Sequence, residues 1–198
     1  MPDDAKAEVE EHIDETGAIY YIERFERLLP VSEFDYGDHY KMSCEACEKY
    51  GKNLACPPYS PSFLTYIDNA QVAKVICLRV PQEYFNHLLS EERYHACFRK
   101  ARSLLVKILL DYREKGHAIA GSGACLACET CAAEDEAECK QCRQPDKLIY
   151  SLESMGVNVI ALVKKSFDID LEWSSDDKFA DFVDAVGVVF LNEDDRIT

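Results

Sequence analysis

Five of the ten cysteines in the chain lie close together, between Ala124 and Pro145. The first three follow one another at two-residue intervals, as a C-x2-C-x2-C run that places three thiols on one tight loop. Ferredoxin-type iron–sulfur clusters are held by such a run together with one more distant cysteine. The stretch therefore indicates a metal centre, and most simply an iron–sulfur cluster. Its cysteines, called here the second cysteine group, are Cys125, Cys128, Cys131, Cys139 and Cys142.

A first cysteine group precedes it in the chain and consists of Cys44, Cys47 and Cys56. Its surroundings predict a rigid loop, because two prolines follow Cys56 and Gly51 permits a turn that other residues resist. A rigid loop that presents thiols is suited to a pre-formed metal site. We expect the two groups to fold together around metal.

Eight thiolates from the two groups would saturate two four-ligand centres. In one partition, the C-x2-C-x2-C run is completed by either Cys142 or Cys56, and the other centre uses Cys44 and Cys47 with the remaining cysteines. Ferredoxins offer a precedent, since the last cysteine of a run there ligates a different cluster. The sequence leaves this pairing open.

Zinc is the main alternative to iron–sulfur. Cys125 with Cys128 and Cys139 with Cys142 would clamp one zinc as two knuckles, and the site would then be structural and redox-silent. Against zinc, Cys131 would have no role and the first group would lack an evident fourth ligand. Thiol redox chemistry without metal is a further alternative.

The formal net charge is −15, from 22 Lys and Arg against 37 Asp and Glu. This sign argues against nucleic acid and against an anionic membrane surface as partners. It suits a basic protein partner, or it simply keeps the protein soluble. Five acidic residues crowd the second group, either as a docking patch for a redox partner or as a solvated loop. They are Glu129, Glu134, Asp135, Glu136 and Glu138.

The chain shows no secretory signal or membrane span. Its first twelve residues are acidic and lack an apolar core, and the longest apolar run, Val72 to Val80, is interrupted by Lys74 and Arg79. We therefore expect a cytoplasmic protein. Because cytosolic thiols stay reduced, many cysteines indicate metal or redox chemistry rather than a disulfide framework.

Periodicity predicts helices and strands around the cysteine groups. Residues 1–15 are expected to form a solvated helix, and Ala18–Ile22 fits either a strand or a helix. A short helix capped by Ser60 should follow the first group. The other predicted strands are residues 73–80, 117–121, 169–173 and 185–191, and the other predicted helices are a long one carrying an apolar stripe from Tyr94 to Tyr112, then 148–155 and 159–165.

These elements predict one α+β domain over residues 1–198, with residues 1–40 as an N-terminal extension. A small mixed sheet should be covered by helices, and two cysteine-rich loops should hold metal at one end. Cys77 lies in a predicted strand and Cys97 on the apolar stripe. Buried free cysteine behaves as a small hydrophobic residue, so both are interpreted as structural.

The motifs together resemble a known family, the cysteine-rich "predicted metal-binding protein" domain of unknown function, found mostly in anaerobic bacteria and archaea. The resemblance spans about residues 41–170. Leu54 and Ala55 depart from it, because the family often carries a tryptophan before its cysteine. The matching pieces are Cys44-x2-Cys47, Tyr50-Gly51-Lys52-Asn53-x2-Cys56-Pro57-Pro58 with Pro61-Ser62, Gly123-x-Cys125-x2-Cys128-x2-Cys131, Cys142-Arg143-x-Pro145 and Ser154-Met155-Gly156-Val157.

The resemblance implies metal binding through seven cysteines, without Cys139. Seven ligands would make one four-cysteine cluster and one three-cysteine site whose open position favours an enzyme over a carrier. The leading functional hypothesis is a cytosolic protein with one or two 4Fe-4S clusters that exchanges electrons with a protein partner. The alternatives are a structural zinc-binding interaction module and an enzyme that uses an under-coordinated cluster iron.

Overall fold

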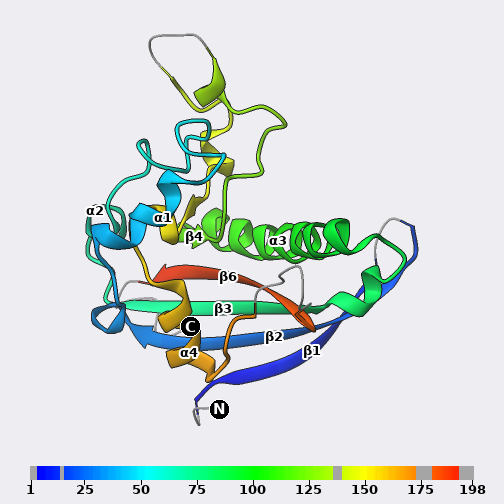
Figure 1. Ribbon diagram of the computed structural model, residues 1–198. Coiled ribbons are helices and arrows are strands. Elements are labelled where there is room, and N and C mark those ends of the chain that lie inside the picture. The colour runs from blue at the N-terminus through cyan, green and yellow to red at the C-terminus, as the bar shows by residue number, and fades with distance from the viewer. Residues whose placement is uncertain (1–3, 14–15, 136–139, 173–179, 192–198) are drawn as a thin grey trace.

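A mixed six-stranded sheet runs through the molecule in the order β1-β2-β3-β6-β4-β5 (Figure 1). Neighbouring strands are antiparallel except β4 and β5, which are parallel. The structure is a computed structural model that describes residues 4–13, 16–135, 140–172 and 180–191. The strands are β1 (Lys6–Ile13), β2 (Ile19–Pro30), β3 (Val72–Pro81), β4 (Ala118–Gly121), β5 (Tyr150–Ser151) and β6 (Phe182–Leu191).

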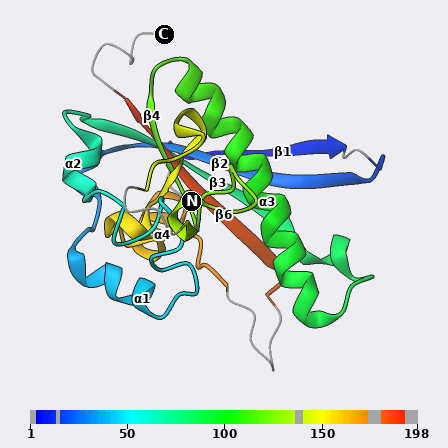
Figure 2. The same ribbon diagram turned by 90° about the horizontal axis from the view of Figure 1, so that it is seen from above.

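Helices cover both faces of this sheet. The long helix α3 crosses one face diagonally, as Figure 2 shows, and α4 packs on the other. The mixed α+β architecture expected from the sequence is therefore confirmed. The α-helices are α1 (Met42–Glu45), α2 (Phe63–Ile67), α3 (Ser90–Glu114) and α4 (Val159–Phe167), and the 3-10 helices are Val31–Glu33, Asp38–Lys41, Gln82–Phe85, Ala132–Glu134, Pro145–Lys147 and Glu153–Met155.

Strand β3 is buried on both faces because it lies inside the sheet between β2 and β6. Successive side chains of a strand point to opposite faces, so Ile76 and Leu78 pack with α3 while Val75 and Cys77 pack with α4. Cys77 is fully buried, and so is Cys97 on α3. Both cysteines belong to the cores, as predicted.

The N-terminal segment departs from its prediction. Residues 6–13 form strand β1 of a hairpin with β2 instead of a solvated helix, and β2 continues the short segment predicted at 18–22 as far as Pro30. Cross-strand charge pairing supports this hairpin, because Arg24 of β2 bonds Glu10 of β1, while Glu26, on the same strand as Arg24, holds the guanidinium from its other side. Strand pairing thus overrides the helical preference of a glutamate-rich segment.

Three other predictions also differ from the structure. Residues 148–155 do not form a helix, because Tyr150 and Ser151 pair in parallel with β4 and a 3-10 turn follows. No strand occurs over residues 169–172, and residue 173 lies outside the described part of the chain. The short helix α2 is capped by Ser62, whose hydroxyl accepts from the Thr65 amide, rather than by Ser60.

The remaining predicted elements are present as β3, β4, β6, α3 and α4, with bounds that differ by a few residues. Lys115 and Gly116 end α3 as expected, since Gly116 adopts a positive φ of 92°. Within the described residues, none of the helices combines the length and the apolar character needed to cross a bilayer.

Candidate metal centre

The first cysteine group begins at Cys44 in α1, and Cys47 and Cys56 follow on a chain of tight turns that leads to α2. The Cys47 amide donates to the Cys44 carbonyl at 3.0 Å, and the Cys56 amide donates to Asn53 at 2.9 Å. Gly51, with a φ of 68°, donates to the Pro57 carbonyl at 2.9 Å and closes the loop. These bonds fold the loop back on itself, so that Cys56 returns toward Cys44 and Cys47.

Electrostatics confirm that these three thiols are neighbours. The pKa of Cys56 is raised to about 12, first by burial and then by the charges of Cys47 and Cys44. Burial also raises the pKa of Cys44, with Glu153 and Cys47 as the next causes. Cys56 is buried, Cys44 is half-buried and Cys47 is exposed.

Four cysteines of the second group line a single cavity of about 190 Å³. They are Cys125, Cys128, Cys131 and Cys142. Cys139 lies outside the described residues. Of the two pairings considered from sequence, the cavity wall includes Cys142 and not Cys56.

Three sulfur atoms at this cavity accept N–H hydrogen bonds. The Ala127 amide donates to Cys125 Sγ at 3.5 Å, and the Gln144 side chain donates to Cys128 Sγ at 3.4 Å. The third donor comes from the other loop, since the Leu54 amide donates to Cys131 Sγ at 3.3 Å. Hydrogen bonds to sulfur also tune the reduction potential of a bound cluster.

The two cysteine loops are in direct contact. Besides the bond from Leu54, the Asn53 side chain donates to the Cys125 carbonyl at 3.3 Å, and Leu54 packs against Ala132 and Ala133. Figure 1 shows both segments on the side of the sheet that α3 covers. The loops therefore meet, while their thiols form two separate sets.

The described cysteines are free thiols. Among the described residues, no group of three or more Cys, His, Asp or Glu side chains is arranged closely enough to hold a metal ion. The sulfur atoms line a common space without converging on one point.

Arg102, which sequence reasoning missed, lies between the two sets. It comes from α3, lines the cavity and donates to the Ala124 carbonyl. Burial lowers the pKa of its guanidinium, whereas Glu153, Cys125 and Cys56 oppose that change. Gly123 makes room for it, since a Cβ at this position would lie 3.1 Å from Arg102 Cζ. A single arginine inside an otherwise apolar helix stripe was the available sequence signal.

Glu153, also missed, follows β5. Parallel pairing of Ser151 with Gly121 places the next residues beside the start of the second cysteine loop. Burial raises the pKa of the Glu153 carboxyl, and hydrogen bonds from Ser151 and the Gly123 amide oppose the rise. The carboxylate is enclosed although the residue as a whole is half-buried, and Oε2 has no hydrogen-bond partner among the described residues.

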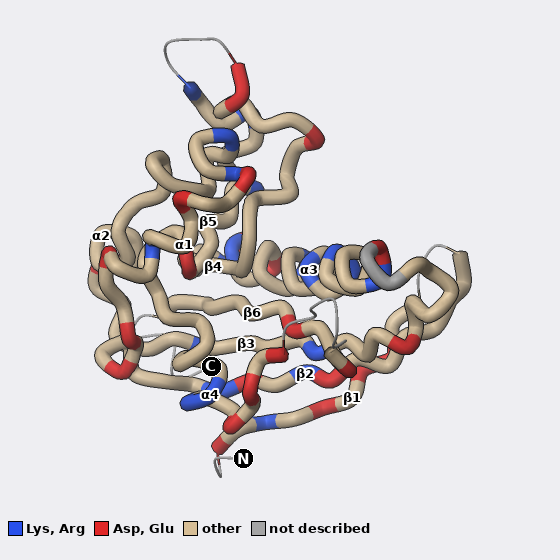
Figure 3. The backbone as a smooth tube through the Cα atoms, in the orientation of Figure 1, with Lys and Arg blue, Asp and Glu red and all other residues tan. Residues whose placement is uncertain are grey.

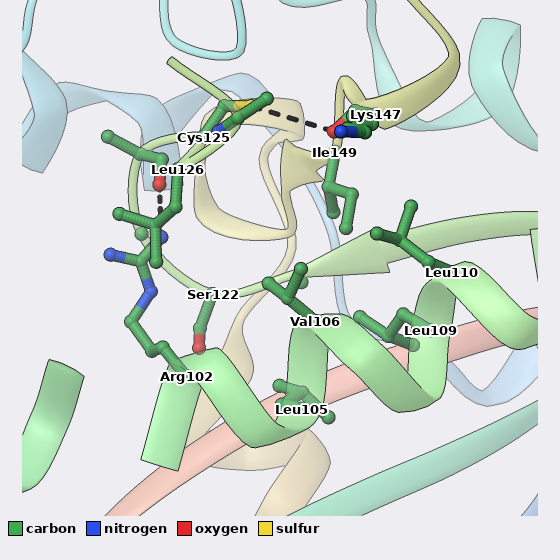
Figure 4. A pocket seen from close by; sticks show the side chains of 14 residues that line it. Arg102, Leu105, Val106, Leu109, Leu110, Ser122, Cys125, Leu126, Lys147 and Ile149 are labelled. Atoms are coloured by element: carbon green, nitrogen blue, oxygen red, sulfur yellow. Dashed lines mark hydrogen bonds between the residues drawn. The ribbon is translucent and has the colours of Figure 1, made fainter. Parts of the chain in front are cut away.

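A second cavity, of about 210 Å³, adjoins the first and shares Arg102 and Cys125 with it. Figure 4 shows its apolar side, formed by α3 side chains such as Val106 and Leu109 together with Ile149. The Cys125 thiol donates to the Lys147 carbonyl at 3.8 Å across its rim. Cys125 is thus the one described cysteine that borders both spaces.

These features define a cysteine-rich α+β protein in which two thiol-bearing loops meet beside a half-buried arginine and a half-buried glutamate. The chain belongs to the family of predicted metal-binding proteins (DUF2284), whose family model matches residues 27–191. The match extends from β2 to β6, which is further than the motifs alone indicated, and it includes both cysteine groups. No curated protein and no solved structure matches the chain.

Proposed function

We propose that the protein binds an iron–sulfur cluster through Cys125, Cys128, Cys131 and Cys142 and serves in electron transfer. The observation that carries this proposal is the common cavity lined by these four thiols. Four cysteines in this order match the ligand count of a [4Fe–4S] centre. All four residues line one space, which is the arrangement that a shared centre requires.

The chain's own groups support a redox role. When bound, a cluster of this kind supplies one-electron exchange. The N–H donors from Ala127, Gln144 and Leu54 stabilise negative charge on the sulfur atoms, and Arg102 adds a positive charge beside Cys125. These groups would ease the addition of an electron, since reduction increases the negative charge of the site.

The first cysteine group would hold a second metal. Its three thiols are electrostatic neighbours, and its loop is pinned to the second group through Asn53 and Leu54. Two metal sites on touching loops would suit electron passage from one to the other. The second site also supports the alternative hypothesis of an enzyme, because three thiolates leave one coordination position of the metal to be filled.

The partner is proposed to be another redox protein in a reducing, cytoplasmic setting. Figure 3 shows acidic and basic positions side by side on the second loop. Asp135 there is paired with Arg143 at 2.6 Å, so this one of the expected acidic positions is neutralised, and Glu136 and Glu138 lie outside the described residues. Glu129 and Glu134, both exposed, remain at the cavity for contact with a basic partner.

The test is elemental analysis and absorbance of protein purified without oxygen. We expect iron and acid-labile sulfide with broad absorbance, and we expect Cys128→Ser to lose them from the second group. Cys97→Ser is the control, because Cys97 lies on α3 and is buried in the core between that helix and the sheet. Zinc without colour would replace the redox proposal with a structural zinc site. Full metal content in Cys128→Ser would refute the cavity as the site.

A further inference from the structure

The first cysteine group offers three thiols, and metal sites of the zinc or iron–sulfur type usually have four ligands at each site. The missing ligand must come from another segment. The 3-10 turn Glu153–Met155, here called the Glu153 turn, is the segment bonded to both sides of this group.

Hydrogen bonds hold the Glu153 turn against the chain on either side of the first group. On one side, the Gly37 amide donates to the Gly156 carbonyl at 2.8 Å, just before α1 and Cys44. On the other, the Ser154 hydroxyl donates to the Ala55 carbonyl at 2.8 Å, one residue before Cys56. Ser60 adds a bond of 2.9 Å to the Ser154 carbonyl. The turn therefore packs between the segment that leads to Cys44 and the segment that carries Cys56.

Glu153 presents an unexplained oxygen at this place. Its Oε2 atom is buried and has no hydrogen-bond partner among the described residues. Burying a carboxylate oxygen without a partner costs free energy, and such groups in native proteins call for an explanation. The Glu153 charge acts on both Cys44 and Cys56, which agrees with its position between them.

We propose that Glu153 is the fourth ligand, through a carboxylate oxygen, of the metal held by Cys44, Cys47 and Cys56. This inference rests on the proposed function, because it presumes a metal at the first group. Glu153 would fill the coordination position that the three thiolates leave open. The metal would then be bound by three sulfur atoms and one oxygen atom. A hard oxygen ligand among soft thiolates is suited to iron or zinc and distinguishes this metal from one bound by four thiolates.

A purely structural role for Glu153, as the counter-charge of buried Arg102, makes different predictions. In that case, Arg102→Gln would affect metal content as Glu153→Gln does, and the double variant would recover from both losses. If Glu153 is a ligand, Arg102→Gln leaves the first site loaded and the double variant resembles Glu153→Gln alone.

The experiment compares metal content and metal X-ray absorption in the unmodified protein and four variants. Glu153→Gln is expected to fall to the metal content of Cys44→Ser, which marks loss of the first site. Glu114→Gln is the matched control, since Glu114 is an exposed carboxylate at the end of α3 that lines neither cavity, and it should match the unmodified protein. Glu153→Cys should keep the metal and lose the oxygen scatterer, because a thiolate takes the position.

Unchanged metal content and spectra in Glu153→Gln would overturn this inference and leave the proposed function standing. An unmodified protein that binds no metal at either group would instead overturn the proposed function. If Glu153→Gln fails to fold, the Cys128→Ser variant, which keeps Glu153, decides the question. Only its first site is loaded. Sulfur-only coordination there would refute Glu153 as a ligand, and one oxygen beside three sulfur atoms would support it.

Discussion

The Leu54 amide donates a hydrogen bond to Cys131 Sγ across 3.3 Å. The two residues belong to different loops that are separated by β3, α3 and β4 along the chain. A donor from the first loop therefore acts on a proposed ligand of the second. The electronic environment of one site thus depends on the fold of the other.

Gln144 should raise the reduction potential of the second site, because its side chain donates to Cys128 Sγ at 3.4 Å. Gln144→Leu removes this donor, and we expect the potential to fall by roughly 20–60 mV, which corresponds to about 0.5–1.5 kcal/mol for one hydrogen bond. Protein-film voltammetry measures the reduction potential. Arg143→Gln serves as the control, since Arg143 is an exposed neighbour that contacts Thr130 and Asp135. An equal shift in both variants would contradict a specific effect of Gln144.

Arg102 should raise the potentials of both sites through its positive charge. Its charge lowers the pKa of Cys56, and the charge of Cys125 acts on it in turn. Arg102→Gln is expected to lower the potentials by roughly 40–90 mV, equivalent to about 1–2 kcal/mol, while Arg102→Lys recovers part of the loss. Redox titration followed by electron paramagnetic resonance checks this. Unaltered potentials in Arg102→Gln would show that the charge is screened.

Metal binding at the first site should strengthen as pH rises. Burial raises the pKa of Cys44, and it raises that of Cys56 to about 12, so both thiols are protonated at neutral pH in the metal-free protein. Metal must displace these protons, and each proton released changes the affinity about tenfold per pH unit. Competition with a chelator between about pH 6.5 and 8.5, corrected for the chelator's own protonation, measures the slope. An affinity independent of pH would mean that thiolates are already present.

Cys77→Ser should reduce stability without reducing metal content. Cys77 is fully buried in the core between the sheet and α4, and a serine hydroxyl there would be costly to bury. We expect the free energy of unfolding to fall by about 1–3 kcal/mol, whereas Cys77→Val, which keeps the site apolar, should cost less. Urea denaturation together with metal analysis distinguishes the two effects. Loss of metal in a folded Cys77→Ser protein would make Cys77 a ligand.

The sequence allowed the central elements to be predicted because their signals are local. β-branched residues marked β3 and β6, and the apolar stripe marked α3 over several turns. The N-terminal strand was misjudged because its partner, β2, decides its conformation. Residues 148–155 were misjudged for a similar reason, since parallel pairing with β4 draws Tyr150 and Ser151 out of a helix.

By itself, the sequence determined which cysteines are candidates for binding metal, since covalent spacing decides which thiols share a loop. It also determined that Cys77 and Cys97 are core residues, because each lies on an apolar face. Only the tertiary structure placed Cys142, and not Cys56, in one cavity with the C-x2-C-x2-C run and brought Arg102 and Glu153 next to the cysteines. Those placements depend on hydrogen bonds and packing between segments far apart in the chain, such as Ser154 with Ala55, which local residue patterns do not encode.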